Sequence, residues 1–573
     1  MPIDEVKAGM VGVGKTVFRG TQIEEFQVEI LGVLNKARPH GDIILAKVSG
    51  GPLAETGVIQ GMSGSPVYIE GRLIGAMAYG WSFATEPITG IVPIGEMLDL
   101  WHQMDLKREI DQGSLKAPQQ LRGLHLPLEE TVIPEAVWQA PIRLASERSS
   151  ALMPLKTPVM LSGFDERVVE QMAPHLEKYG LVPIQAGSAA DAALGPVTLE
   201  PGATLAAQLV SGDASMSAIG TLTYRENDRI MGFGHPMFYA GNVDFPMTGA
   251  YVHSILPSRL VSFKLASVTQ RMGVLQQDRR AGVAGIIGRE ASMLPIQLAI
   301  HYGDEAPSEA YFFEIIDNKF FSPNLVAWTA LNALLASGTA MGDATMELDA
   351  NIAIEGYPDL EVNNLFAGAA PQAVLATELN EIFGLLLRNA LEKVHLQGLV
   401  LDIWVETGRR TARISSARVD KRTVEPGEEI QVTAFLEPYR GETQPLSFVI
   451  RVPEDAPEGR LALQLSDANS AMAWEHKRAP HRFQFQNLTQ LLDVLRELAR
   501  NDQLIAQLVM ARGGAVIRGQ ELPSLPPSAL TVLRGLQQEG EGGLTHEVVL
   551  QEKRLSTDYV LFGQIALPLT VKR

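Results

Sequence analysis

The sequence predicts a mainly β protein with α/β insertions. Short stretches in which apolar and polar residues alternate recur along the chain, and Gly-rich turns separate them, which is the pattern of half-buried strands. Helical periodicity is confined to a few segments, of which the clearest are 165–179, 324–336 and 372–394. We therefore expect several β domains, together with a helix that lies between two strands.

Composition narrows the class of protein. Of the 573 residues, 46% are hydrophobic and 20% are charged, which is typical of globular proteins with several cores. The net charge of −18 disfavours nucleic acid and anionic membranes as partners, because both select clustered Lys and Arg. The chain contains no cysteine, which excludes disulfides, cysteine nucleophiles and thiolate metal sites. It also has no apolar run of about 18 residues and begins without the features of a signal peptide. We therefore expect neither a transmembrane helix nor a signal peptide in this chain.

The strand and helix patterns change along the chain and suggest domain boundaries. Strand-like stretches such as Asp42–Val48 and Leu73–Tyr79 precede a helix at Ile94–Met104, which indicates a small β-barrel or sandwich. A polar segment from Lys107 to Arg122 is typical of a linker. Alternation like that of an immunoglobulin-like sandwich, without its cysteine pair, returns near residue 399. We assign five regions: 1–106, a β-barrel; 107–200, a linker and an α/β insertion; 201–397, a second β domain with helices; 398–472, an immunoglobulin-like β-sandwich; and 473–573, a small α+β tail.

The most distinctive short motif is Gly61-Met62-Ser63-Gly64-Ser65-Pro66, in a turn between two predicted strands. A serine between small residues, with glycines free to adopt positive φ, can present its hydroxyl clear of its own backbone as a nucleophile. The same turn can direct the backbone N–H groups of Gly61 and Ser63 at a developing oxyanion. Alone the motif is weak, because similar hexapeptides are common hairpin turns.

A nucleophilic serine needs a base, and histidine has a suitable pKa. Among the eleven histidines, His235 differs because Gly234 and Pro236 fix the backbone on either side of it, at the end of a predicted strand. A purely structural role as a turn residue explains the sequence about as well. Ser63 and His235 are thus the candidates for a nucleophile and a general base.

Other chemistries find less support in the sequence. Residues 9–16 satisfy the Walker A spacing, but no buried strand precedes them and a strand pattern follows them, where phosphate binding needs a helix. No histidine or carboxylate spacing typical of zinc or calcium sites occurs, so we expect no metal and no other cofactor. Paired carboxylates of the glycosidase kind have no distinctive local frame.

Three blocks of the sequence resemble the SpoIVB peptidase family, serine endopeptidases also called family S55. The first is Thr56-Gly57-Val58-Ile59-Gln60-Gly61-Met62-Ser63, preceded by the similar stretch 20–30. The second runs from Ile219 to His235, and the third is Asp278-Arg279-Arg280-Ala281-Gly282-Val283-Ala284-Gly285. The first block is specific to the family, and the other two are moderately so.

The resemblance implies a chymotrypsin-like double β-barrel peptidase core, with Ser63 as the nucleophile and His235 as the general base. It makes residues 201–397 the second barrel, which carries the histidine. It also implies a protein or peptide substrate and an extracytoplasmic location in bacteria, periplasmic or secreted, where the family acts in signalling proteolysis.

The chain departs from the family pattern in two respects. In the family the histidine block precedes the serine block, whereas here the serine comes first, which implies either a circularly permuted pair of barrels or a divergent branch. The family also carries an aspartate shortly before its serine, where this chain has Ser49-Gly50-Gly51. Asp244, Asp42 and Asp278 are the possible orienting acids, and a Ser–His dyad is the alternative.

We therefore expect a serine endopeptidase that forms an acyl-enzyme and serves in signalling or processing. The alternative hypothesis is a catalytically inactive, peptidase-like protein that binds other proteins or serves as a scaffold, because the third catalytic residue is missing and much of the chain lies outside the resemblance. Nucleotide hydrolysis at residues 9–16 is a third and weaker hypothesis.

Overall fold

The computed structural model describes residues 1–572 except 39–40, 82–83, 85, 112–151, 188–196, 259–260, 304–308, 339–341, 518–519, 523–524, 527 and 529–541. The described chain forms two compact units. Unit 1 comprises Met1–Pro295 and Phe312–Asn332, and unit 2 comprises Ile296–Tyr311 and Ala333–Arg573. Strands make up 54% of the structure and helices 18%, which confirms the predicted mainly β class.

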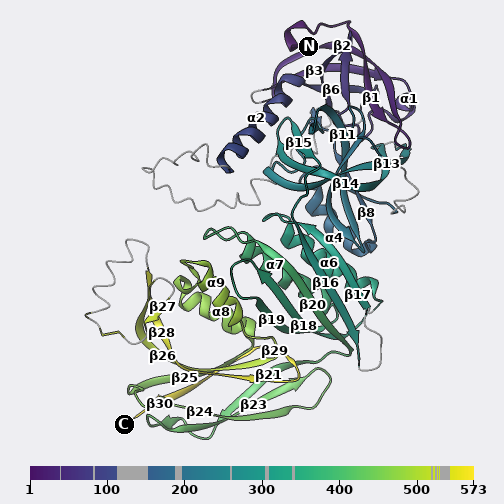
Figure 1. The fold of residues 1–573 in the computed structure, drawn as a ribbon. Coiled ribbons are helices and arrows are strands. Elements are labelled where there is room, and N and C mark those ends of the chain that lie inside the picture. The colour runs from purple at the N-terminus through teal and green to yellow at the C-terminus, as the bar shows by residue number, and fades with distance from the viewer. Residues whose placement is uncertain are drawn as a thin grey trace. The chain divides into compact units, whose positions relative to one another are not determined.

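Unit 1 begins with a closed antiparallel barrel of six strands (Figure 1). The strand order is β4-β1-β2-β3-β6-β5, and pairing of β4 with β5 closes the ring. Phe26, Val28 and Ile30 are buried in the barrel while the residues between them are exposed, so the alternation read from the sequence is the inside and outside of one strand. The strands are β1 Val11–Val17, β2 Ile23–Arg38, β3 Gly41–Ser49, β4 Pro66–Ile69, β5 Arg72–Gly80 and β6 Ile88–Pro93.

A second antiparallel ring of six strands follows in unit 1. Its order is β10-β13-β14-β15-β12-β11, and β11 pairs back onto β10. Phe233, Phe245 and Leu275 are among its fully buried residues. Together the two rings form the double β-barrel core that the sequence predicted. The strands are β10 Thr204–Gly212, β11 Ser215–Glu226, β12 Arg229–Gly232, β13 Gly241–Leu256, β14 Phe263–Arg279 and β15 Gly282–Ile287.

The predicted α/β insertion is a strand–helix–strand unit that extends the second sheet. Its two strands are parallel, and β8 pairs with β11 of the barrel. The helix begins after Asp165, whose carboxylate accepts the backbone N–H of Arg167, and it buries Val168, Met172 and Leu176. The elements are β7 Met153–Pro154, which pairs with β5, and β8 Thr157–Ser162, α4 Glu166–Glu177 and β9 Leu181–Gln185.

The helix expected at the end of the first barrel is longer than predicted. Helix α2, Ile94–Asp111, extends past Lys107, where the linker was expected to begin. Its residues Met97, Leu100 and Trp101 pack with Met231 of the second barrel. The rest of the predicted linker, 112–122, lies outside the described residues. The short helices of this region are η1 Ile3–Glu5 and α1 Leu53–Thr56.

Unit 2 starts with a sheet in the order β19-β18-β20-β16. Helix α7 packs beside β18 and β19 (Figure 1) and buries Leu379, Ile382 and Phe383, as their helical spacing predicted. The helix ends at Leu387, whereas the sequence suggested that it runs to residue 394. In unit 1, β17 pairs with β10 through residues 313–315. The bounds are β16 Met293–Tyr302, β17 Glu309–Ile316, α6 Ser322–Ala336, β18 Ala344–Ile354, β19 Leu360–Gly368, α7 Pro371–Leu387 and β20 Leu396–Thr407.

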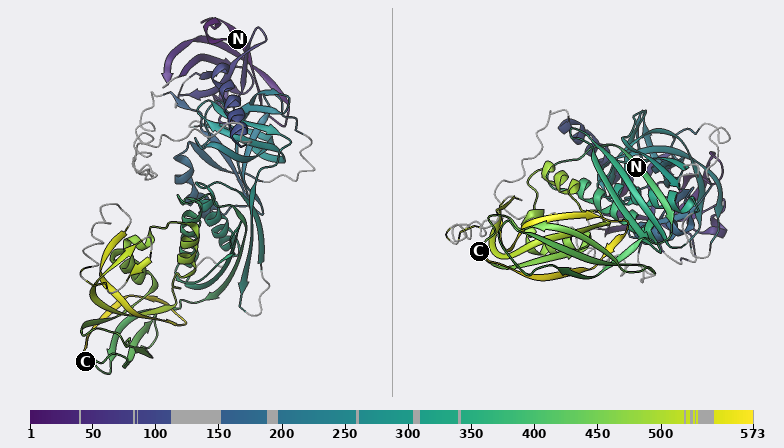
Figure 2. Two further views of the ribbon diagram at one scale, coloured as in Figure 1. Left: turned by 60° about the vertical axis from the view of Figure 1, so that its left-hand side comes forward. Right: turned by 90° about the horizontal axis from the view of Figure 1, so that it is seen from below.

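The C-terminal part of unit 2 is a β-sandwich of two sheets that share one hydrophobic core (Figures 1 and 2). One sheet has the order β24-β23-β21-β29, and the other has the order β22-β30-β25-β26-β27 with β28 also paired to β26. The elements are β21 Thr411–Val419, β22 Thr423–Val424, β23 Glu429–Pro438, β24 Gln444–Arg451, β25 Gly459–Ser466, α8 Ala468–Arg478, η2 Pro480–Phe483, α9 Leu488–Arg496, β26 Gln503–Ile517, β27 Gln520–Leu522, β28 Gly542–Ser556, β29 Val560–Phe562 and β30 Gln564–Val571.

The strands of this sandwich differ from those expected within 398–472. Strand β20 lies outside the sandwich, in the sheet that starts unit 2, beside β18 and β16. The sandwich instead takes strands from residues 503–571, which the sequence placed in a separate tail. Alternation shows that a segment is a half-buried strand, but it does not show which sheet the strand joins.

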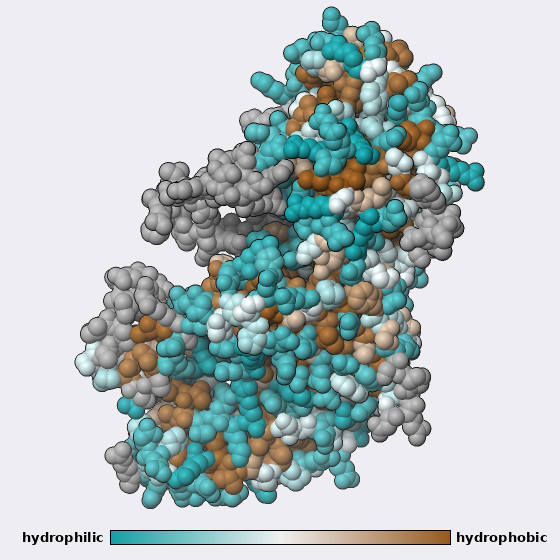
Figure 3. Space-filling view, viewed as in Figure 1, coloured by the Kyte–Doolittle hydropathy of each residue, from teal (hydrophilic) through white to brown (hydrophobic). Residues whose placement is uncertain are grey.

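The surface seen in Figure 3 is largely hydrophilic, with hydrophobic residues in small groups. Among the described residues, no helix combines the length and apolarity needed to span a bilayer.

Candidate active site

The serine motif forms a loop between α1 and β4, in which Gly61 has φ 93° and Gly64 has φ 97°. Each backbone carbonyl from residue 60 to residue 64 accepts a hydrogen bond. The donors are Lys264 N to Gln60 O at 3.1 Å, Thr221 Oγ1 to Gly61 O at 2.8 Å, Ser65 N to Met62 O at 2.9 Å, Thr221 N to Ser63 O at 2.8 Å and Thr223 Oγ1 to Gly64 O at 2.7 Å. Strands β11 and β14 of the second barrel therefore hold the serine loop of the first.

Gly64 permits the serine loop to lie close to the backbone of the second barrel. A Cβ atom at this position would lie 2.0 Å from the carbonyl oxygen of Thr221 and 2.4 Å from the backbone nitrogen of Phe233. Its positive φ is also unfavourable for residues with a side chain. The loop can thus pack against the second barrel only with glycine at this position.

The predicted oxyanion donors are the backbone N–H groups of Gly61 and Ser63. In the described part of the chain, the N–H groups of Gly61 and Ser63 make no hydrogen bond, while the carbonyls of the same two peptide groups, Gln60 O and Met62 O, are both held. The peptide bonds here are trans, so each N–H points away from its carbonyl. Unused N–H groups beside a serine are available to donate to an oxyanion.

His235 follows β12 in a loop that begins with two residues of positive φ, Phe233 at 65° and Gly234 at 68°. Its Nδ1 atom lies 2.9 Å from the carbonyl oxygen of Pro236. Because a carbonyl can only accept, Nδ1 carries the hydrogen and Nε2 carries the lone pair. The side chain is buried, and burial lowers the pKa of His235 to about 4, so the imidazole is neutral at physiological pH.

The loops that carry Ser63 and His235 meet on strand β5. Gly64 N donates to the carbonyl of Met77 at 2.7 Å, and a Cβ at Gly234 would lie 3.4 Å from the same oxygen. The hydroxyl of Ser63 and Nε2 of His235 are both buried, and neither has a hydrogen-bond partner among the described residues. The two reactive groups are therefore in neighbouring loops without a hydrogen bond between them.

Asp278 holds the loop that follows His235. Its buried carboxylate accepts the backbone N–H groups of Met237 and Phe238 at 2.7 Å each and of Ala240 at 3.2 Å. Burial raises the pKa of Asp278, and the hydrogen bonds from these amides act against that rise. Asp278 fixes the backbone around Pro236 and thus acts on His235 indirectly.

None of the three candidate acids hydrogen-bonds the imidazole of His235. Asp42 accepts the backbone N–H of Lys36 at 2.7 Å, and Asp244 accepts that of Ser292 at 2.9 Å. The carbonyl of Pro236 occupies the position at Nδ1 that an orienting acid would take.

Comparison with protein-family models identifies the first barrel. Residues 2–98 match the model of the SpoIVB peptidase S55 family. These residues belong to the SpoIVB peptidase family. The match includes the serine loop with Gly61, Ser63 and Gly64, and it supports a serine peptidase. Searches of curated proteins and of solved structures found no match.

Lys264 is a residue of this SpoIVB-like site that the sequence did not reveal. Its side chain is fully buried on β14, and its ammonium group donates to Thr16 Oγ1 at 2.8 Å and to Thr221 Oγ1 at 3.4 Å. Its neighbours Phe263 and Leu265 are apolar, so alternation would assign Lys264 to the solvent-facing side of the strand. The pairing of β14 with the serine loop, which buries Lys264, is not visible in the sequence.

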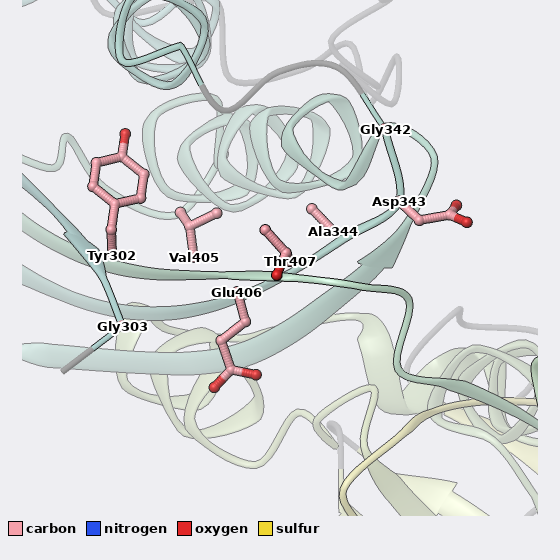
Figure 4. Close-up of a pocket in the computed structure, with 8 residues that line it drawn as sticks. All are labelled: Tyr302, Gly303, Gly342, Asp343, Ala344, Val405, Glu406 and Thr407. Carbon is pink, nitrogen blue, oxygen red and sulfur yellow. The ribbon is translucent and has the colours of Figure 1, made fainter. Parts of the chain in front are cut away.

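Two other regions do not support a second kind of chemistry. Residues 11–17 form β1 of the barrel, and a turn and strand β2 follow where a nucleotide-binding loop needs a helix. In unit 2, Tyr302, Val405 and Thr407 line a pocket, with Glu406 pointing to the opposite side of its strand (Figure 4). The described lining contains neither a histidine nor a serine. No cluster of metal-binding side chains occurs among the residues the structure describes.

Proposed function

We propose that this protein is a serine endopeptidase in which Ser63 attacks the scissile carbonyl and His235 accepts its proton. The bond from Ser63 Oγ to the carbonyl carbon forms as the proton moves to Nε2, and the N–H groups of Gly61 and Ser63 stabilise the oxyanion. His235 then gives the proton to the leaving amine. Water, activated by the same Nε2, releases the acyl group.

One observation carries this proposal: His235 has the tautomer that a general base requires. The hydrogen bond between Nδ1 and Pro236 O leaves the lone pair on Nε2, and that atom has no other partner among the described residues. Held carbonyls in the serine loop favour preorganised oxyanion donors. Asp278 supports the geometry through the loop that contains Pro236.

Burial of both residues sets a condition on the reaction. Ser63 is 0% exposed and His235 is 2% exposed, so a peptide can reach the hydroxyl only after neighbouring groups move. We propose that substrate binding opens the site and brings Oγ within hydrogen-bond distance of Nε2. Catalytic hydrogen bonds are often absent from unliganded sites and form in the complex.

The test is covalent labelling with a fluorophosphonate probe, read by peptide mass mapping, on wild type, Ser63→Ala and His235→Ala. Such probes modify serines that a base activates, so no substrate need be known. We expect label on Ser63, its complete loss in Ser63→Ala and a reduction of roughly a thousandfold in His235→Ala, as for removal of a general base. Ser65→Ala, two residues along the same loop, is the matched control and keeps the label.

A second candidate function is that of a peptidase-like binding or scaffold protein. The observation that favours it is the complete burial of Ser63 without a bonded base. This function predicts a folded protein that never labels at Ser63, even in the presence of peptide libraries. Labelling of Ser63 that depends on His235 would exclude it.

The physiological setting follows from the family resemblance. We propose that the protein acts on protein substrates outside the bacterial cytoplasm, in signalling or processing. Cell fractionation of the full-length native gene product tests the location, and recovery in the cytoplasmic fraction alone would contradict it.

A further inference from the structure

Lys264 makes three contacts at and beside the serine loop. Its backbone N–H donates to Gln60 O at 3.1 Å, its ammonium group donates to Thr221 Oγ1 at 3.4 Å, and its aliphatic chain lies 3.3 Å from the position of a Cβ on Gly61. Thr221 in turn donates its hydroxyl hydrogen to Gly61 O at 2.8 Å. A hydroxyl has one hydrogen, so what faces its oxygen decides where that hydrogen goes.

We propose that Lys264 is a positioning residue for the serine loop: its ammonium group directs the Thr221 hydroxyl toward Gly61 O, and loss of the lysine proton releases that hydroxyl. An ammonium group can only donate, so Thr221 must give its hydrogen to Gly61 O. A neutral amine has a lone pair and competes with Gly61 O for the same hydrogen. The peptide group between Gly61 and Met62 is therefore held more firmly when Lys264 is charged.

The surroundings of Lys264 make such a change of charge accessible. The groups that face its ammonium are the hydroxyls of Thr16 on β1 and Thr221 on β11, and no ion pair among the described residues includes it. The nearest charged side chain along β1, Lys15, is partly exposed and pairs with Glu25 at 3.5 Å. Burial alone lowers the pKa of Lys264, to about 7.

This inference rests on the proposed function only for its effect on reactivity. The position of the Thr221 hydroxyl can be followed without any reaction at Ser63. The amide nitrogen of Met62 belongs to the same peptide group as Gly61 O, so its NMR chemical shift reports the hydrogen bond to that oxygen. Met62 can be observed in deuterated protein labelled with ¹⁵N at methionine and assigned by Met62→Leu.

The experiment follows the Met62 signal and the fluorophosphonate labelling rate of Ser63 between pH 5.5 and 9 in the full chain. We expect the Met62 shift to titrate with a midpoint near pH 7. We also expect the labelling rate to fall about fivefold above that midpoint, the effect of one ordinary hydrogen bond. Lys264→Met and Thr221→Val abolish both transitions. Thr223→Val removes the equivalent hydrogen bond to Gly64 O, which Lys264 does not contact, and keeps both transitions.

The outcomes separate the two proposals. If the Met62 signal of wild type shows no transition near pH 7, the role of Lys264 is overturned, whatever the labelling result. The role is also overturned if Thr221→Val shows the same transition as wild type. A transition in Met62 that depends on Lys264, in a protein that never labels at Ser63, would support the positioning role and overturn the peptidase proposal. Thr221→Val keeps the test decisive if Lys264→Met does not fold.

Discussion

The Nδ1 atom of His235 lies 2.9 Å from the carbonyl oxygen of Pro236, the next residue in the chain. In a Ser-His-Asp triad a carboxylate occupies this position and stabilises the imidazolium that forms during the reaction. A carbonyl fixes the same tautomer but supplies no full negative charge. The arrangement therefore orients the base without strengthening it.

The first prediction concerns the pH dependence of His235. Burial lowers the pKa of His235 to about 4, so the ring keeps its lone pair at Nε2 from about pH 4 upward. We expect the labelling rate of Ser63 to rise with a midpoint near pH 4, well below the value of about 6.5 for a solvated histidine. The rate should be measured from pH 3.5 to 7, with His235→Gln as the control that lacks this transition. A midpoint at or above 6.5 would contradict the burial-lowered pKa.

The second prediction concerns Asp278. Replacing it by Asn leaves one acceptor oxygen where two oxygens now bind three backbone N–H groups. We expect the free energy of unfolding to fall by about 2–4 kcal/mol, because buried amides lose an acceptor. Urea denaturation measures this loss. In Asp244→Asn, where the carboxylate accepts one exposed amide, the loss should stay below about 1 kcal/mol.

The third prediction separates backbone strain from steric overlap. Gly64→Ala places a Cβ 2.0 Å from Thr221 O, so we expect a loss of about 3–5 kcal/mol and loss of labelling at Ser63. Gly71 also has a positive φ, 75°, but an added Cβ meets no atom within 4 Å. Gly71→Ala should therefore cost only about 1–2 kcal/mol. Equal losses in the two variants would show that the loop does not pack as closely as described.

The fourth prediction links Lys264 to the pH dependence of stability. The folded pKa of about 7 is below the ordinary lysine pKa of 10.5, so between these values the unfolded chain binds more protons than the folded one. The stability of wild type relative to Lys264→Met should therefore rise from pH 7 to pH 10, by at most about 5 kcal/mol. Denaturation midpoints of both proteins at several pH values measure this difference. A difference that is constant over this range would mean that Lys264 titrates normally.

Much of the fold could be predicted because each strand has one buried face. The alternation of Phe26, Val28 and Ile30 and the helical spacing of Val168, Met172 and Leu176 both correspond to buried faces. The membership of each strand in a sheet could not be predicted in the same way. Strand β20 has the same alternation as the strands of the sandwich, yet its partners are β16 and β18.

The site was only partly readable for a related reason. Serine, histidine and glycine carry a chemical signal at their own positions, so Ser63 and His235 could be proposed from their neighbours. The carbonyl of Pro236 and the contacts of Lys264 carry no such signal, because a backbone acceptor is the same in every residue and a buried lysine looks like a surface one. The contacts of Lys264 depend, in addition, on the pairing of β14 with the first barrel.

The position of the serine loop in the chain has a consequence for biosynthesis. Thr221 follows Gly61 by 160 residues, so a ribosome adding about 5–20 residues per second needs roughly 8–32 s to deliver the group that holds the loop. During that interval the emerging chain carries Ser63 without the strands that hold its loop and without His235. Under the proposed function, nascent molecules are thereby unable to cut their neighbours on the same messenger until the second barrel has folded.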